Sequence, residues 1–327
     1  MTSTTMEAIK ELSLTTGTAI MDVVFPTTKI MVPNLLKNKS SILSVPRSTH
    51  SYGSHPRHTL DLYPSSSTSS SSPILIYLYG GGLVYGDKIL DIPVLENLVY
   101  HNLGAFFAKR GITTIIPDYR RVDTEAGGEG AIYPSGAEDI STVLQWLSKT
   151  DLLDGKGNKR DVYLMGNSAG GLHIATYLLE PRYLEERKSW QGESNVSLKG
   201  FVGVGVPYNF DGALADRKET LDRYYGSDEN IETKSPYGLL KVVGESKKSR
   251  DELGIPKLLV LYSEWDPVDE ILKSNHDFVK LAEEAWGEKI EVIEIQGHNH
   301  ISPPMALSSG EGEEWGEQAA RWIKGNA

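Results

Sequence analysis

The chain has 327 residues, of which 39% are hydrophobic, with a formal net charge of −11 and no cysteine. This composition is typical of a globular protein that buries a substantial core, and the lack of cysteine excludes disulfides, thiol catalysis and thiolate metal sites. The acidic charge argues against nucleic acid as a partner, because such binders concentrate lysine and arginine. It favours an uncharged or cationic small molecule.

Short apolar runs alternate with helical periodicity along most of the chain. Two strands are predicted first, and the residues between them, 64–73, are expected to form a flexible Ser-rich surface loop. Ser135 followed by Glu138 has the spacing of a capping box, which predicts a helix that begins there. The predicted strands are 58–63, 74–79, 112–117, 162–165, 200–206, 256–263 and 289–296, and the other predicted helices are 95–110, 169–179, 268–286 and 315–324.

Strands that alternate with helices imply a mostly parallel central sheet with helices on both faces, and ligands bind such sheets beyond the carboxyl ends of the strands. The motif order favours a single domain over residues 1–327. An N-terminal segment, 1–50, is expected to pack over the active-site face, with Pro26 and Pro33 breaking any long helix. The polar segment 207–254 is too long for a plain connection and is expected to be a partly helical cap.

The chain begins without a basic segment followed by an unbroken apolar stretch, so no signal peptide is predicted. No run approaches the roughly 20 apolar residues that span a bilayer. A cytoplasmic protein without stable membrane insertion is expected, and the sequence leaves a homodimer open.

The pentapeptide from Gly166 to Gly170 has the G-x-S-x-G pattern and lies between a predicted strand and a predicted helix. A serine at such a turn adopts a strained backbone that exposes its hydroxyl, and small neighbours let the strand and the helix approach. A bare match is more often a glycine-rich turn with an ordinary serine. The strand and helix on either side favour Ser168 as a nucleophile.

A glycine-rich stretch, Tyr79 to Gly82, ends an earlier strand. A tetrahedral intermediate carries a negative oxygen, and main-chain N–H groups of glycines can converge on it. Gly81, Gly82 and Ala169 are therefore the expected donors of an oxyanion hole. A phosphate-binding loop is the alternative, but this stretch has neither the G-x-x-x-x-G-K-[ST] nor the G-x-G-x-x-G pattern.

A carboxylate follows the strand that ends at residue 263. Asp266 can accept a hydrogen bond from an imidazole and fix its tautomer, because Pro267 turns the chain directly after it. Glu264 and Asp269 are close enough to compete for this role. A non-catalytic explanation for these acidic residues is a solvated helix start, which suits Asp269 well.

Two histidines, His298 and His300, follow the last predicted strand. Histidine is the side chain best suited to take a proton from serine and return it to a leaving group near neutral pH. A surface-loop histidine with no role is the alternative for either one. Position favours His300.

No metal site is predicted. His50, His55 and His58 lie near Asp61, but their spacing is mixed across a turn and a strand. They are interpreted as scattered surface residues.

Together these motifs resemble the α/β-hydrolase esterase/lipase family over residues 57–325, in particular the branch similar to hormone-sensitive lipase and kynurenine formamidase. The family's H-G-G-G, Asp-Tyr-Arg, G-D-S-A-G-G, D-P-[LV] and G-x-x-H motifs are matched in order by Tyr79–Gly82, Asp118–Arg120, Gly166–Gly171, Asp266–Val268 and Gly297–His300. The resemblance implies an α/β-hydrolase fold without a cofactor. It implies Ser168 as nucleophile, His300 as general base and then acid, and Asp266 as the residue that orients His300.

Two positions depart from the family. Tyr79 stands where the family usually has histidine, and Asn167 where it often has aspartate. The first is expected to alter how the oxyanion loop is held and which acyl group fits. The second is a mild change beside the nucleophile.

The sequence therefore predicts a serine esterase that cleaves a carboxylic ester, a lactone or an aryl formamide of a small to medium-sized molecule through an acyl-enzyme on Ser168. The same triad could instead catalyse acyl transfer, cyclisation or condensation, which a water-excluding cap would favour. A non-catalytic ligand-binding protein is a third reading. It would have no need to retain all three triad residues.

Overall fold

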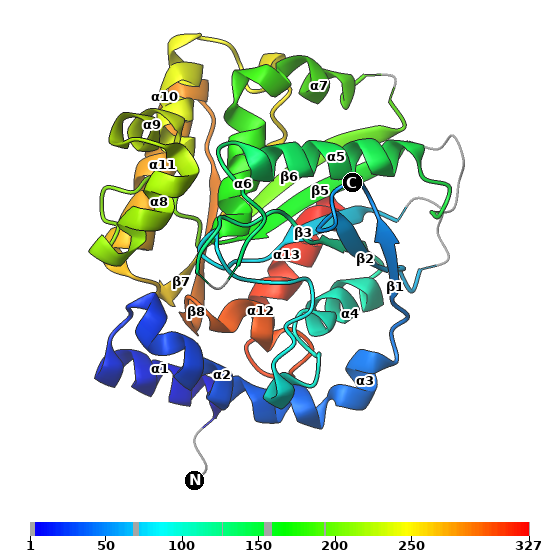
Figure 1. Ribbon diagram of the computed structural model, residues 1–327. Helices are drawn as coiled ribbons and strands as arrows, with labels where there is room; N and C mark the ends of the chain where they lie inside the picture. The colour runs from blue at the N-terminus through cyan, green and yellow to red at the C-terminus, as the bar shows by residue number, and fades with distance from the viewer. Residues whose placement is uncertain (1–3, 68–71, 126, 154–158, 193, 327) are drawn as a thin grey trace.

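An eight-stranded sheet forms the centre of the computed structural model, which describes residues 4–67, 72–125, 127–153, 159–192 and 194–326 (Figure 1). The strand order is β1-β2-β4-β3-β5-β6-β7-β8. β2 pairs antiparallel with both β1 and β4, and the other neighbours are parallel, which confirms the mostly parallel sheet. The strands are β1 (Ser48–Ser51), β2 (Thr59–Tyr63), β3 (Ile74–Leu78), β4 (Thr113–Pro117), β5 (Arg160–Asn167), β6 (Val196–Val204), β7 (Lys257–Trp265) and β8 (Glu291–Asn299).

Helices cover both faces of the sheet, and for this reason β3 and β4 are buried along their whole length (Figure 1). α5 and α6 pack against each other, and Gly316 of α13 lies against Phe106 of α4. The helices outside the N-terminal segment and the cap are α4 (His101–Lys109), α5 (Ser135–Lys149), α6 (Ala169–Leu179), α7 (Leu184–Ser189), α11 (Lys273–Trp286), α12 (Ser302–Ala306) and α13 (Glu314–Gly325), with short helical turns η1 (Pro93–Leu95), η2 (Pro181–Tyr183) and η5 (Val268–Leu272).

The N-terminal segment is more helical than its prolines suggested. α1 (Thr5–Thr16), α2 (Ile20–Lys37) and α3 (Lys39–Leu43) fill it, and α2 continues through Pro26 and Pro33. An internal proline costs a helix about 3 kcal/mol. α2 offsets this cost by burying apolar side chains such as Val23 and Met31 against the rest of the fold. The expected break at the prolines is wrong.

This segment lies beside the end of β8 (Figure 1). α1 packs against β8, and α2 packs against α12. The Asn299 side chain donates a hydrogen bond of 2.7 Å to the Thr27 hydroxyl, which joins α2 to the last residue of β8. The N-terminal helices therefore support the loop that carries His300.

The predicted capping box at α5 is wrong. Ser135 is the first residue of the helix rather than its cap, and its hydroxyl donates to the Ile132 carbonyl at 2.6 Å. Glu138 instead accepts a hydrogen bond of 2.9 Å from Arg120. A long-range ion pair thus replaces the local cap.

The structure also differs from the sequence predictions at one helix and one strand, and one predicted loop is described only in part. The helix predicted at 95–110 begins only at His101, after η1 and a turn. No sequence pattern indicated β1, because this edge strand is polar and largely exposed. Residues 68–71 of the Ser-rich loop lie outside the described residues.

The segment expected to be a cap is largely helical and lies to one side of the sheet (Figure 1). It contains η3 (Ala215–Arg217), α8 (Lys218–Tyr225), α9 (Asp228–Lys234), α10 (Pro236–Glu245) and η4 (Asp251–Leu253). α10 packs on α6 and α11, so these helices rest on the layer that also covers β5 and β7.

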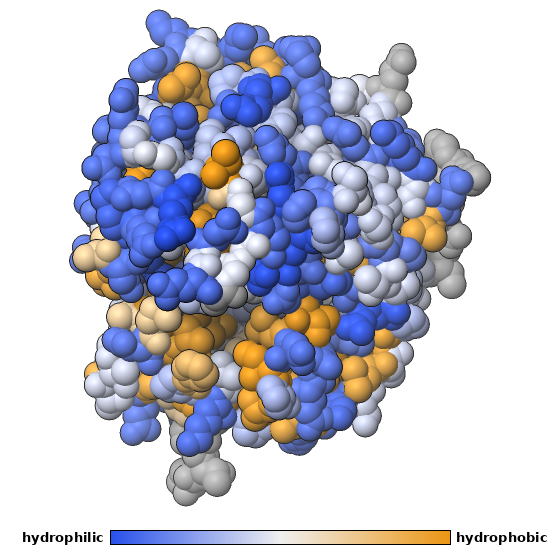
Figure 2. All heavy atoms as spheres, in the orientation of Figure 1, coloured by the Kyte–Doolittle hydropathy of each residue, from blue (hydrophilic) through white to orange (hydrophobic). Residues whose placement is uncertain are grey.

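Apolar side chains gather in the lower part of the same view, over α2 and the turn around η1, which pack together (Figure 2). Met21, Phe25, Ile92 and Val94 are all exposed there. Within the described residues, no helix combines the length and the hydropathy needed to cross a membrane.

Candidate active site

Ser168, His300 and Asp266 meet at one edge of the sheet, each directly after a strand. Ser168 follows β5, Asp266 follows β7 and His300 follows β8. His300 Nε2 lies 3.0 Å from Ser168 Oγ, and His300 Nδ1 lies 2.6 Å from Asp266 Oδ1. Because a carboxylate only accepts, Nδ1 carries the proton and Nε2 is free to accept the proton of Ser168. This arrangement is that of a serine activated by an oriented imidazole.

The carboxylate of Asp266 is fixed at both oxygens. Oδ2 accepts the main-chain N–H of Ser263 at 2.6 Å, while Oδ1 faces His300. Asp266 is 1% exposed and His300 is 4% exposed. Both side chains are therefore held away from bulk water, where their hydrogen bond is electrostatically stronger.

The backbone at Ser168 is strained in the way that the sequence pattern predicts. Its φ of 50° and ψ of −121° lie in a region that residues with a side chain rarely adopt. A Cβ on Gly166 would collide with Gly171, and one on Gly170 would collide with the main chain of Leu78. Strain of this kind costs on the order of 1–3 kcal/mol, and close packing of strand and helix maintains it.

The structure separates the competing candidates from this hydrogen-bonded chain. Glu264 accepts the main-chain N–H of Gly297 at 2.7 Å and so fixes the loop before His300. Asp269 is exposed at the start of η5. His298 Nδ1 bonds the Ser302 hydroxyl at 2.9 Å, and burial lowers the pKa of this imidazole to about 4. His298 is thus a neutral, structural side chain.

The glycine-rich loop after β3 lies against the nucleophile. An ideal Cβ on Gly80 would be 3.2 Å from Ser168 Cβ. Within the described residues, the main-chain N–H groups of Gly81, Gly82 and Ala169 donate to no protein acceptor. Ala169 also begins α6, whose N-terminal dipole favours negative charge. The loop and the helix start thus present free donors beside the Ser168 hydroxyl.

Tyr79 holds this loop in place through its side chain. It stands at the position where the esterase/lipase family that the sequence resembles usually has histidine. Its hydroxyl donates to Asp118 Oδ1 at 2.7 Å and accepts from Arg57 Nη2 at 2.9 Å. Its ring stacks on Tyr100 and Tyr119, and the Tyr119 hydroxyl donates to the Tyr79 carbonyl at 2.7 Å. Burial raises the pKa of Tyr79 well above its ordinary value, so the phenol stays neutral and can donate.

The Asp-Tyr-Arg motif extends this network. Arg120 binds Asp139 through both its main-chain N–H and Nε at 2.8 Å, and Asp139 also meets His58 Nε2 at 3.0 Å. His58 is buried, so its interpretation as a surface residue is wrong. Arg57 and His58 were not identified as part of the site's support, and no local pattern around them signals that role.

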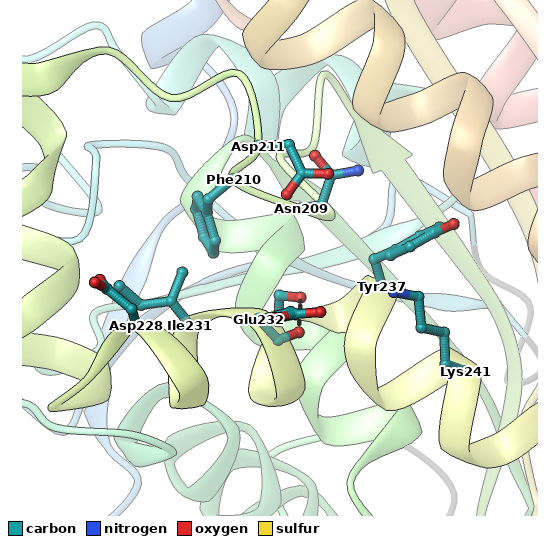
Figure 3. Close-up of a pocket in the computed structure, with 9 residues that line it drawn as sticks. Asn209, Phe210, Asp211, Asp228, Ile231, Glu232, Tyr237 and Lys241 are labelled. Carbon is teal, nitrogen blue, oxygen red and sulfur yellow. Dashed lines mark hydrogen bonds between the residues drawn. The ribbon is translucent and has the colours of Figure 1, made fainter.

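The cap carries a cavity of its own, of about 220 Å³ (Figure 3). In that view the Glu232 side chain lies between Phe210 and Tyr237. The cavity is lined by Asn209, Phe210, Asp211, Asp228, Ile231, Glu232, Ser235, Tyr237 and Lys241. Ser168, Asp266 and His300 are not among its lining residues, so this cavity is distinct from the triad.

Known structures share this architecture. Esterase B from Lactobacillus rhamnosis, in an inhibited form, is similar with a TM-score of 0.65 at 17% identity, over 90% of this chain and 96% of that one. An esterase from Pyrobaculum calidifontis has a TM-score of 0.62 at 19% identity, over 97% and 96%. The family model described as BD-FAE matches residues 60–211, which include the glycine-rich loop and the Ser168 turn. The chain has the α/β-hydrolase fold that these esterases share.

Curated relatives of this α/β-hydrolase include plant proteins with methylesterase names. Isoprenylcysteine alpha-carbonyl methylesterase ICME of Arabidopsis thaliana is 28% identical over 262 residues, which are 76% of this chain and 55% of that protein. A probable ICME of Oryza sativa subsp. japonica is 29% identical over 165 residues, 49% of this chain and 35% of that protein. The chain thus spans about half or less of the length of these relatives.

Proposed function

We propose that this α/β-hydrolase is a serine esterase that cleaves a carboxylic ester of a small to medium-sized molecule. The observation that carries the proposal is the hydrogen-bonded chain from Ser168 Oγ through His300 to Asp266, with distances of 3.0 and 2.6 Å. The solved structures with a similar fold are esterases, and the plant relatives are named methylesterases. Both observations support an ester as the substrate over a lactone or an aryl formamide. We also propose that it acts in the cytoplasm, as its cysteine-free composition suggests.

The reaction has two halves. His300 Nε2 takes the hydroxyl proton of Ser168 while Oγ attacks the ester carbonyl, and the resulting oxyanion is held by the N–H groups of Gly81, Gly82 and Ala169. The intermediate collapses when His300 returns the proton to the leaving alcohol, which leaves an acyl group on Oγ. Water then attacks this ester with His300 as base, and the acid and free Ser168 are released. Asp266 keeps Nδ1 protonated throughout.

Labelling by a fluorophosphonate and turnover of 4-nitrophenyl acetate test this proposal together. We expect the wild-type protein to be labelled with time and to turn over, Ser168→Ala to lose both signals, and His300→Ala to lose nearly all turnover. His276→Ala is the matched control, because His276 is an exposed histidine on α11, and it should behave as wild type. A folded wild-type protein that is neither labelled nor active would overturn the proposal in favour of a ligand-binding role.

A further inference from the structure

One cap residue reaches over the glycine-rich loop. Arg217 ends η3, and an ideal Cβ on Gly82 would lie 3.5 Å from Arg217 Nη1. Gly80 of the same loop touches Ser168, and two residues of chain span at most about 7 Å. Gly82 itself is exposed. The guanidinium therefore lies against the same glycine-rich loop that contacts Ser168.

The guanidinium is held from one side only. Arg217 Nε donates to Glu270 Oε1 at 3.2 Å, and the Glu270 side chain is 11% exposed. Glu270 belongs to η5, the turn that starts just after Asp266, so the triad's own loop positions the arginine. In the part of the chain that the structure describes, Nη1 and Nη2 of Arg217 donate to no acceptor.

Other arginines near the site use up their donors within the protein. Arg121 donates Nε and Nη2 to Glu129 at 3.1 and 2.8 Å and Nη1 to the Gly86 carbonyl. Arg217 differs, because its terminal edge offers two parallel N–H donors next to the loop. Such an edge matches a carboxylate in shape and charge and binds it with two hydrogen bonds.

We propose that Arg217 is a specificity residue that binds a carboxylate on the acyl group of the substrate, so that half-esters of short dicarboxylic acids are preferred. The inference rests on the proposed esterase function. The carbonyl oxygen is expected to point at Gly81 and Gly82, and groups on the acyl carbon therefore start beside the loop that Arg217 overlies. Although the chain carries a net charge of −11, and Arg217 Nε is paired with Glu270, the two terminal nitrogens of Arg217 remain available to an anion. The proposal thus replaces the uncharged or cationic substrate expected from composition with an anionic one.

The test compares two esters that differ in one terminal group. Mono-4-nitrophenyl glutarate carries a carboxylate where 4-nitrophenyl pentanoate carries a methyl group. The readout is the ratio of the two kcat/KM values, glutarate over pentanoate, for wild type, Arg217→Gln and Arg217→Lys. Arg223→Gln is the matched control, since Arg223 is a cap arginine on α8 that pairs with Glu219 and the change removes the same charge.

We expect Arg217→Gln to lower this ratio by at least about tenfold, through KM for the glutarate ester, since hydrogen bonds between charged groups are worth this much. Arg217→Lys should recover part of the ratio, and Arg223→Gln should leave it unchanged. A ratio that stays the same in Arg217→Gln, in an enzyme that hydrolyses the pentanoate ester, overturns this inference alone. A wild-type protein that hydrolyses neither ester overturns the proposed function and this inference with it.

Discussion

The phenol of Tyr79 offers a direct test of how the oxyanion loop is held. Tyr79→Phe removes one oxygen and keeps the ring that stacks on Tyr100 and Tyr119. The change deletes a bond of 2.7 Å to Asp118 and one of 2.9 Å from Arg57, both charged partners. Hydrogen bonds to charged groups contribute about 1.5–3 kcal/mol, so we expect a loss of this size in the free energy of unfolding. For 327 residues this lowers Tm by about 2–4 °C.

The loss should stay near that of one bond, because neither charged partner is orphaned. Asp118 keeps Lys88 Nζ at 2.9 Å, and Arg57 keeps Asp87 and the Gly86 carbonyl. We also expect kcat to fall by about tenfold, since the loop glycines follow Tyr79 directly and a removed oxyanion donor costs about 10²–10³.

Tyr77→Phe is the matched control for this experiment. Tyr77 lies two residues earlier on β3 and is fully buried, but its hydroxyl has no hydrogen-bond partner among the described residues. Removing it should be neutral or slightly stabilising. The assays are urea unfolding, thermal unfolding and 4-nitrophenyl acetate turnover. Equal effects of the two variants on stability and kcat would refute the assigned role of the Tyr79 hydroxyl.

Three further changes test the site. Asp266→Asn places an amide N–H toward His300 and should lower kcat by about 10³- to 10⁴-fold, whereas Asp269→Asn should stay near wild type; similar losses would contradict the assignment. Ser168→Gly should unfold in urea with about 1 kcal/mol more stability than Ser168→Ala, because glycine adopts φ 50° without strain, and equal stabilities would argue against that strain. The pKa of His298 is about 4 in the fold and 6.5 when unfolded, so the unfolded chain binds more protons between these values. Stability should therefore drop by about 2 kcal/mol from pH 7 to pH 5 through this residue, and His298→Gln should flatten the urea-unfolding profile; an unchanged slope would count against it.

The triad residues were accessible from sequence because each has a short-range signal. Ser168, Asp266 and His300 each follow an apolar run directly, and parallel strands bring their carboxyl ends to one edge. The choice between His298 and His300 was harder, because it depends on a contact with Gly312 that no local pattern shows. Their hydrogen-bonded arrangement could be predicted, but not the reason that His298 stays out of it.

The supports of the site could not be predicted, because they depend on pairs that are distant in sequence. Arg57 meets Tyr79 and Arg217 meets Glu270 only after the sheet and the cap have assembled. The persistence of α2 through Pro26 has the same cause, since burial in the folded protein outweighs a local preference. Local rules thus predicted seven of the eight strands and the motifs, while long-range packing decided the rest.

The hydrogen bond between Thr27 and Asn299 can form only late in the synthesis of the chain. These residues are 272 positions apart, and ribosomes add about 5–20 residues each second, so α2 waits roughly 15–50 s for its partner to be made. During this interval the faces of α1 and α2 that later rest on β8 and α12 have nothing to cover them. The N-terminal helices of this protein therefore reach their final packing only after its last strand has been made.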